Sequence, residues 1–164
     1  MTPPREQVAG LVLIGGKSER MGRPKALAEL AGEPLWRHVA RALQPLVREI
    51  FFLGHVSGFV PPVEMPQLAD DPAGIGPLGG LVAGLEQSEY NHHLLVAVDY
   101  PLVRPALLSA MLAKADLAKA VCGQPGDVVD PLIGCYHADC APVIRRMLAA
   151  SDTRTHQLLQ RVAS

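Results

Sequence analysis

Residues 8–27 read VAGLVLIGGKSERMGRPKAL, an apolar run that passes directly into a loop rich in glycine and cations. Val8 to Ile14 carry no polar side chain, which is typical of a strand buried on both faces of a sheet. Two glycines, Gly15 and Gly16, follow at once. This stretch therefore predicts a buried strand whose carboxyl end opens into a ligand-binding loop.

The rest of the chain extends this pattern. Further apolar runs predict strands, and apolar or small residues at helical spacing predict helices. The expected strands are 50–53, 67–69, 94–98, 118–122 and 132–136. The expected helices are 34–46, 78–87, 105–115, 141–150 and 155–162. Alternating helices and apolar strands indicate an α/β sandwich with a mainly parallel sheet, and 164 residues suit a single domain over 1–164.

Three loops are expected to meet at one edge of that sheet. They are the opening loop, the segment DDPAGIGPLGG (residues 70–80) and Asp99-Tyr100-Pro101, and each follows a predicted strand. Ligands of such sheets bind beyond the carboxyl ends of the strands. We therefore expect the binding site where these three loops converge.

The opening loop fits neither of two familiar glycine patterns. A P-loop needs a hydroxyl directly after its lysine, whereas Lys25 is followed by alanine, and five residues separate Gly16 from Gly22. The dinucleotide fingerprint G-x-G-x-x-G is absent as well. The loop nevertheless combines glycine amides with four cations, a set that suits polyphosphate: Gly15, Gly16, Gly22, Lys17, Arg20, Arg23 and Lys25.

Carboxylates follow two of the other predicted strands. Asp99 could hold Mg²⁺, a hard cation that prefers oxygen ligands, or could cap the helix after Pro101. Of Asp70 and Asp71, one could accept N–H bonds from a nucleobase and the other could cap the glycine-rich turn. His92 and His93 precede a predicted strand, and we interpret them as surface residues.

Composition excludes some classes of function. Fifteen Lys and Arg against 16 Asp and Glu give a formal net charge of −1, which argues against nucleic-acid binding through bulk charge. No apolar run approaches the roughly 20 residues that a membrane span needs. The first seven residues lack the apolar core of a signal peptide, so we expect a soluble cytoplasmic protein.

The opening loop also resembles a family signature. LIGGKSERMGRPKAL (residues 13–27) is similar to L-[AI]-G-G-x-S-x-R-M-G-x-x-K-x-L of the molybdenum cofactor guanylyltransferases. GPLGGLVAGL (76–85), VAVDYPLV (96–103) and DPLIGCY (130–136) resemble later segments of that family. The resemblance implies a Rossmann-like three-layer α/β/α sandwich like that of the nucleotide-diphospho-sugar transferases.

The resemblance implies transfer of GMP from Mg-GTP to molybdopterin with release of pyrophosphate. Carried over by position, catalysis falls to Arg20, Lys25 and Asp99, and Mg²⁺ to Asp99. The implied nucleotide-binding residues are Leu13, Ile14, Gly15, Gly16, Lys25, Asp70 and Asp99. The resemblance also implies transient contact with molybdopterin-supplying or molybdoenzyme-maturation proteins. By position, residues near Pro101 and the turn GQPGDVVD (123–130) are candidates for the pterin side.

The sequence departs from the family pattern at two points. Gly54 and His55 follow the second strand, where the family usually has a polar residue such as asparagine. The family segment F-x-N-[IV]-N-T-P-E-D-L, expected near the metal and the second substrate, does not occur. Two alternatives stay open. One is a cytidylyltransferase or another MobA-like nucleotidyltransferase that acts on a different small phosphate. The other is a nucleotide-binding relative without turnover.

Overall fold

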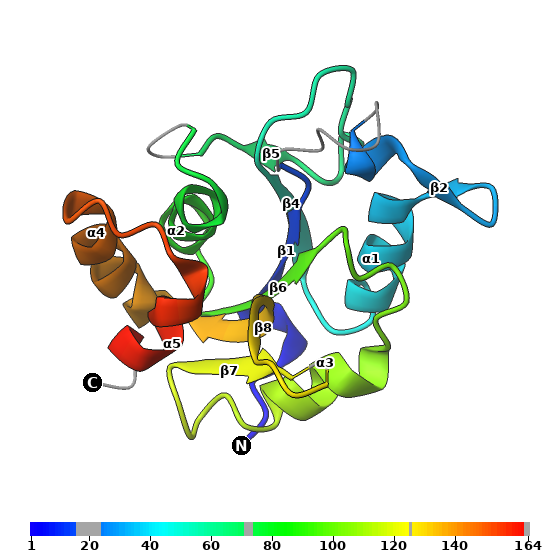
Figure 1. Cartoon of the computed structure of the whole chain (residues 1–164). Coiled ribbons are helices and arrows are strands. Elements are labelled where there is room, and N and C mark those ends of the chain that lie inside the picture. The colour runs from blue at the N-terminus through cyan, green and yellow to red at the C-terminus, as the bar shows by residue number, and fades with distance from the viewer. Residues whose placement is uncertain (16–23, 71–73, 125, 163–164) are drawn as a thin grey trace.

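The computed structural model describes residues 1–15, 24–70, 74–124 and 126–162, and a six-stranded sheet lies at its centre (Figure 1). The strand order is β5-β4-β1-β6-β8-β7. The strands are β1 (Val8–Leu13), β4 (Glu49–Leu53), β5 (Gln67–Leu68), β6 (His92–Ala97), β7 (Ala120–Gly123) and β8 (Asp130–His137). β1, β4, β5 and β6 are parallel, whereas β8 is antiparallel to β6 and β7. The expected mainly parallel sheet is confirmed.

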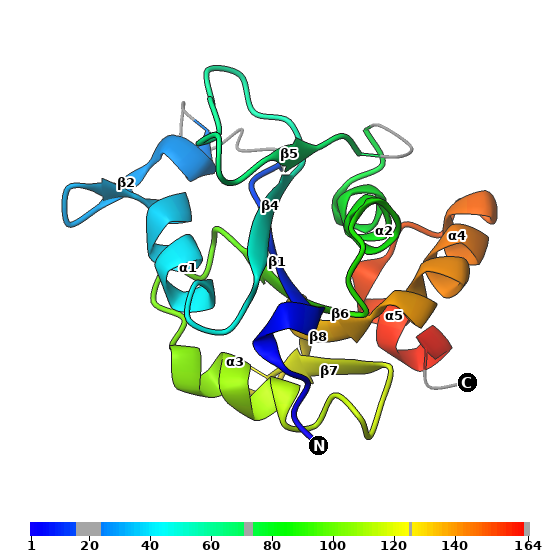
Figure 2. The same ribbon diagram turned by 180° about the vertical axis from the view of Figure 1, so that it is seen from behind.

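Helices cover both faces of the sheet, as Figures 1 and 2 show. On one face lie α1 (Leu35–Leu43) and α3 (Pro105–Leu112). On the other lie α2 (Pro77–Gln87), α4 (Ala141–Ala149) and α5 (Thr155–Val162). Short 3₁₀ turns complete the chain at η1 (Arg5–Gln7), η2 (Lys25–Leu27) and η3 (Ala138–Cys140). The three-layer α/β/α arrangement agrees with the expected fold class.

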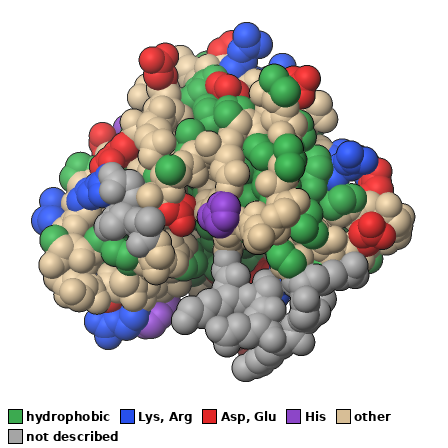
Figure 3. Space-filling view, turned by 90° about the horizontal axis from the view of Figure 1, so that it is seen from above, with side chains coloured by type: hydrophobic (Ala, Val, Ile, Leu, Met, Phe, Trp, Pro, Cys, Tyr) green, Lys and Arg blue, Asp and Glu red, His purple; other side chains and the backbone are tan. Residues whose placement is uncertain are grey.

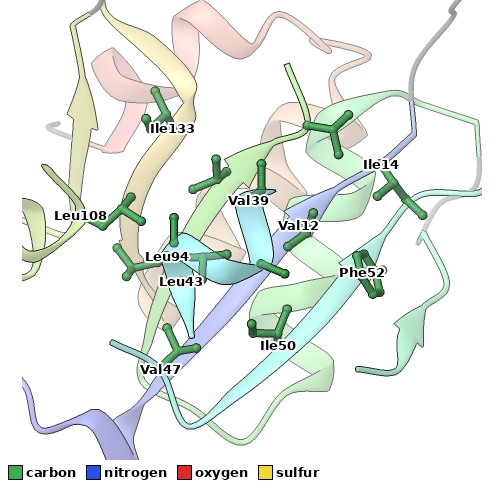
Figure 4. Close-up of a cluster of buried hydrophobic side chains, with 14 of the residues drawn as sticks. Val12, Ile14, Val39, Leu43, Val47, Ile50, Phe52, Leu94, Leu108 and Ile133 are labelled. Atoms are coloured by element: carbon green, nitrogen blue, oxygen red, sulfur yellow. The ribbon is translucent and has the colours of Figure 1, made fainter. Parts of the chain in front are cut away.

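Each sheet face contributes to its own hydrophobic core because side chains alternate along a strand. In β1, all six residues are buried. Val12 packs toward α1 and α3, as the close-up of that cluster shows (Figure 4), whereas Leu11 and Leu13 belong to the cluster under α2 and α4. Burying each such side chain fully stabilises the fold by about 1.5–3 kcal/mol. The apolar run of β1 therefore packs against both helical layers.

Glycines in α2 bring that helix close to the sheet. A Cβ at Gly84 would lie 2.8 Å from Leu11 Cδ1, and a Cβ at Gly80 would lie 3.3 Å from Leu53 Cβ. Both distances are shorter than ordinary carbon contacts. Gly80 and Gly84, both within residues 76–85, therefore serve helix–sheet packing.

A hairpin between the opening loop and α1 was not expected from the sequence. β2 (Glu29–Leu30) and β3 (Glu33–Pro34) pair antiparallel around Ala31 and Gly32, whose φ angles are 52° and 78°. Two positive φ angles in a two-residue loop define a type I′ turn, which suits a tight hairpin. Pro34 therefore ends β3, and α1 begins at Leu35 instead of Pro34.

The interpretation of His93 as a surface residue is wrong. His93 is the second residue of β6 and is fully buried. Its Nε2 lies 2.6 Å from Ser88 Oγ, which itself donates to the Gly84 carbonyl at 2.7 Å. Nε2 therefore donates to Ser88, and the imidazole is neutral. Burial lowers the pKa of His93 to about 4.

Candidate active site

The carboxyl ends of four parallel strands meet at one edge of the sheet. The opening loop leaves β1 at this edge, Asp70 follows β5, and Asp99 follows β6. Figure 3 views the molecule from above Figure 1, and most of the charged side chains on this face lie toward its margin. The strand ends from which the three loops leave therefore lie at the same edge of the sheet, as expected.

A direct ion pair joins two of the expected site residues. Lys25 Nζ donates to Asp99 Oδ2 at 3.0 Å, although 74 positions separate the two residues in sequence. Their side chains remain 41% and 49% exposed, respectively. An ion pair this exposed contributes only about 0–1 kcal/mol to stability. The ion pair therefore adds little to the stability of the fold, and its position at the sheet edge indicates a binding site.

Asp99 is held by a tight backbone turn. The Tyr100 amide donates to the Ala97 carbonyl at 3.0 Å, so Asp99 is the third residue of the turn that follows β6. The preceding residue, Val98, donates to the Leu13 carbonyl at 3.1 Å. The turn that carries Asp99 is thus attached to the end of β1.

The backbone groups at the end of β1 form hydrogen bonds with neighbouring chain segments of the sheet. The Leu53 carbonyl accepts from the Ile14 amide at 3.0 Å and from the Gly15 amide at 3.4 Å. The side chains of Leu13 and Ile14 are buried in the two cores. Direct nucleotide contacts by Leu13 and Ile14 would therefore be limited to main-chain atoms. The role of the Gly15 amide toward phosphate stays a prediction.

Gly15 and Gly54 explain one departure from the family pattern. A Cβ at Gly54 would lie 2.7 Å from the nitrogen and Cα of Gly15, and Gly54 has a φ of 89°. Both the contact and the dihedral require glycine. Where the family usually has a polar side chain, Gly54 makes a close backbone contact that lets the ends of β1 and β4 approach each other. The next residue, His55, is exposed.

Some expected residues lie outside the described part of the chain. They include two predicted to act on the nucleotide, Gly16 and Arg20, and the remaining candidates Lys17, Gly22, Arg23 and Asp71. Their roles stay predictions.

Asp70 lies at the other side of the site from Asp99. Its Oδ1 is buried and has no hydrogen-bond partner among the described residues, and a Cβ at Gly80 would lie 3.2 Å from it. Desolvation raises the pKa of Asp70, while a hydrogen bond with the Gly54 backbone opposes that rise. A buried acceptor without a partner costs free energy, which a ligand N–H donor would recover.

Two cavities open at this edge of the sheet. The larger, about 600 Å³, is lined by Asp99 together with mostly apolar residues of the β6–α3 loop and β8, among them Pro101, Leu102 and Ile133. The smaller, about 400 Å³, contains Asp70 and His55. Residues from both segments suggested for the pterin side line the larger cavity, among them Pro101, Gly123 and Gln124. Their contact with the pterin stays a prediction.

The donor set at Asp99 fits a nucleotide-bound magnesium ion. Mg²⁺ is usually held by one or two carboxylates together with phosphate oxygens and water. Asp99 offers a half-exposed carboxylate at the sheet edge. The described residues contain no group of three His, Cys, Asp or Glu side chains able to enclose a cation. The described residues therefore suit a metal that arrives with phosphate ligands of its own.

Two polar residues beside Asp99 lie in segments singled out from the sequence, but neither was assigned an individual role there. The Tyr100 hydroxyl donates to Asp130 Oδ2, and Asp130 Oδ1 accepts from the Leu132 amide at 2.8 Å. Asp130 begins β8, whose antiparallel direction brings its first residue to the edge where β6 ends. The aspartate before Pro131 was visible in the sequence, but its position depended on that strand direction.

In the described parts of the chain, no helix combines the length and the apolar character needed to cross a membrane.

The chain is similar to known proteins over most of its length. The family model of the MobA-like NTP transferase domain matches residues 10–164. A relative from Pelotomaculum thermopropionicum, named "Probable molybdenum cofactor guanylyltransferase", is 32% identical over 144 residues. The match covers 88% of this chain and 70% of that protein.

Two solved structures share the fold. Molybdopterin-guanine dinucleotide biosynthesis protein A from Archaeoglobus fulgidus has a TM-score of 0.77 at 22% identity, covering 94% of this chain and 80% of its own. Rv0371c from Mycobacterium tuberculosis, solved as a complex with manganese, has a TM-score of 0.67 at 14% identity, covering 86% and 76%. At these identities the likeness supports the nucleotidyltransferase fold. The match over residues 10–164 shows that the chain belongs to the MobA-like NTP transferase family and is a nucleotidyltransferase.

Proposed function

We propose that this protein transfers GMP from Mg-GTP to the phosphate of molybdopterin and releases pyrophosphate. The observation that carries the proposal is the Lys25–Asp99 pair, set at the sheet edge beside the larger cavity. A cation and a carboxylate in contact match the two needs of a metal–nucleotide complex, which are charge neutralisation of phosphate and an oxygen ligand for the metal. The guanylyltransferase name of the Pelotomaculum relative supports the choice of substrates.

The reaction requires no strong general base. An oxygen of the acceptor phosphate, already ionised at neutral pH, attacks the α-phosphorus of GTP. A new P–O bond forms there while the bond from the α-phosphorus to the bridging oxygen breaks, and pyrophosphate leaves with that electron pair. Catalysis then consists of positioning and of neutralising negative charge.

The residues divide this work. Lys25 exchanges Asp99 for phosphate oxygens and neutralises charge on the departing pyrophosphate, with Arg20 as a second cation. Asp99 would hold Mg²⁺, which when bound supplies charge neutralisation at the phosphates. Asp70 would accept N–H bonds from guanine in the smaller cavity, where its buried Oδ1 has no described partner.

The larger cavity would receive the acceptor. Its walls are mostly apolar, with Leu102, Val103 and Ile133 among the residues that line it, and Asp99 lies at its border. Apolar walls with a few polar groups suit a flat heterocycle whose phosphate points toward the nucleotide. The proposal is tested by measuring dinucleotide and pyrophosphate formation from molybdopterin with GTP, compared with CTP. Product from CTP at the higher rate would favour the cytidylyltransferase alternative.

A further inference from the structure

The loop that carries Asp99 is joined to the neighbouring strand β8 by a side-chain hydrogen bond. The Tyr100 hydroxyl donates to Asp130 Oδ2. The other oxygen of this carboxylate, Oδ1, accepts from the Leu132 amide within the same strand at 2.8 Å. The register pairs Val96 of β6 with Ile133 of β8, so the start of β8 lies beside the end of β6. The Leu132 amide of the same strand therefore orients the Asp130 carboxylate toward the Tyr100 hydroxyl.

Tyr100 belongs to two consecutive turns. Its amide closes the turn that contains Asp99 by donating to the Ala97 carbonyl at 3.0 Å, and its carbonyl accepts from the Val103 amide at 3.1 Å. Its ring packs against both hydrophobic cores, and it lines the larger cavity beside Asp99. Any shift of the Tyr100 side chain would therefore be transmitted to the Asp99 turn and to the cavity wall.

We propose that the hydrogen bond from Tyr100 to Asp130 is a positioning contact that holds Asp99 in the orientation needed for the metal–nucleotide complex. This inference rests on the proposed function of the Lys25–Asp99 site. Misplacing a catalytic group by about 1 Å can cost on the order of 100-fold in rate, so a contact that orients Asp99 affects turnover without touching substrate.

Asp130 acts here as a hydrogen-bond acceptor. Each of its oxygens already accepts a hydrogen bond, one from the Tyr100 hydroxyl and one from the Leu132 amide. Burial, reinforced by the hydrogen bond to Asp130, raises the pKa of Tyr100 to about 12. The phenol therefore keeps its proton and remains a donor throughout the neutral range.

The test removes the hydroxyl and retains the ring. In Tyr100→Phe we expect kcat to fall about 10-fold with a change of less than about threefold in KM for GTP, because Asp99 is misoriented while nucleotide binding persists. The same variant should need about fivefold more Mn²⁺ for half-saturation in the presence of GTP, measured by electron paramagnetic resonance. Amide exchange in residues 97–103 should quicken. Asp130→Asn keeps an acceptor oxygen and should recover part of the rate that Asp130→Ala loses.

Tyr90→Phe provides the matched control. Tyr90 also donates to a carboxylate, Glu49 Oε2 at 3.1 Å, and its ring also contacts the core, against Phe51. It precedes β6 and so lies at the opposite edge of the sheet. Removing the Tyr90 hydroxyl should leave kcat, Mn²⁺ affinity and amide exchange in residues 97–103 as in the wild type.

The outcomes separate this inference from the proposed function. Wild-type kcat and Mn²⁺ affinity in Tyr100→Phe overturn the inference, even if the loop exchanges faster. An equal fall in kcat in Tyr90→Phe also overturns the inference, because the effect would then be general destabilisation. If the wild type transfers neither GMP nor CMP, the proposed function fails. Mn²⁺–GTP affinity then still decides whether the Tyr100–Asp130 bond orients Asp99.

Discussion

Lys25 and Asp99 form an ion pair of 3.0 Å between η2 and the turn after β6. In the proposed reaction each of these groups would take a different partner once substrate binds: phosphate for the lysine and metal for the carboxylate. The pair therefore keeps both charges compensated at the sheet edge before the metal–nucleotide complex arrives. Binding exchanges one set of charge contacts for another, so neither charge is left without compensation.

Neutralising either member of this pair should reduce turnover far more than stability. In Asp99→Asn and in Lys25→Ala we expect GMP transfer to fall on the order of 100-fold, because a charge-stabilising group is lost. The free energy of unfolding, measured with denaturant, should change by no more than about 1 kcal/mol, since the pair is half exposed.

Glu89→Gln and Lys114→Ala are the matched controls, because both residues are exposed and lie outside the described site. Wild-type turnover in folded Asp99→Asn would remove the metal assignment of that residue.

Asp70 should determine the choice of base. In Asp70→Asn the amide replaces an acceptor oxygen with a donor, so the ratio of GTP to CTP turnover should fall by about 10-fold or more. Stability at neutral pH should not fall, because desolvation raises the pKa of Asp70 and makes its ionised form costly in the folded state. An unchanged GTP-to-CTP ratio would exclude Asp70 from base recognition.

Gly54 should tolerate no side chain. Gly54→Ala places a Cβ 2.7 Å from the Gly15 backbone at a φ of 89°, so we expect a loss above about 3 kcal/mol from overlap and strain together. Gly32→Ala is the control. Its φ is 78° and a Cβ there meets no atom within 4 Å, so only about 1–2 kcal/mol of strain should appear. Equal losses in the two variants, measured by urea unfolding, would show that close packing at Gly54 is unimportant.

His93 should make the fold sensitive to mild acid. Its folded pKa of about 4 lies below the ordinary value of 6.5, so the unfolded chain takes up the proton first. The stability that follows from the neutral His93 is fully present above about pH 6.5 and is lost progressively as the pH falls toward 4. The loss in free energy of unfolding is about 2 kcal/mol at pH 5. In His93→Gln the loss of unfolding free energy between pH 7 and pH 5 should be smaller by that amount. The exposed His156→Gln should keep the wild-type loss, and a His93→Gln profile that matches the wild type contradicts this origin.

The sequence predicted the sheet and its binding edge because these depend on local patterns. Long apolar runs such as Val8–Leu13 form buried strands, and Asp99 had to lie at a carboxyl end once 94–98 was assigned as a strand. The β2–β3 hairpin was missed because two-residue strands carry no periodic signal. The burial of His93 and the contact between Tyr100 and Asp130 depend on which strands pair and in which direction, which local pattern does not encode.

The most direct measurement is the transfer reaction itself. The purified chain, Mg²⁺ and molybdopterin are incubated with GTP or with CTP, and the dinucleotide product and pyrophosphate are quantified. We predict one pyrophosphate for each guanine dinucleotide formed, with GTP preferred over CTP by at least about 10-fold. Absence of dinucleotide with GTP, or faster product formation with CTP, would contradict guanylyl transfer to molybdopterin at the Lys25–Asp99 site.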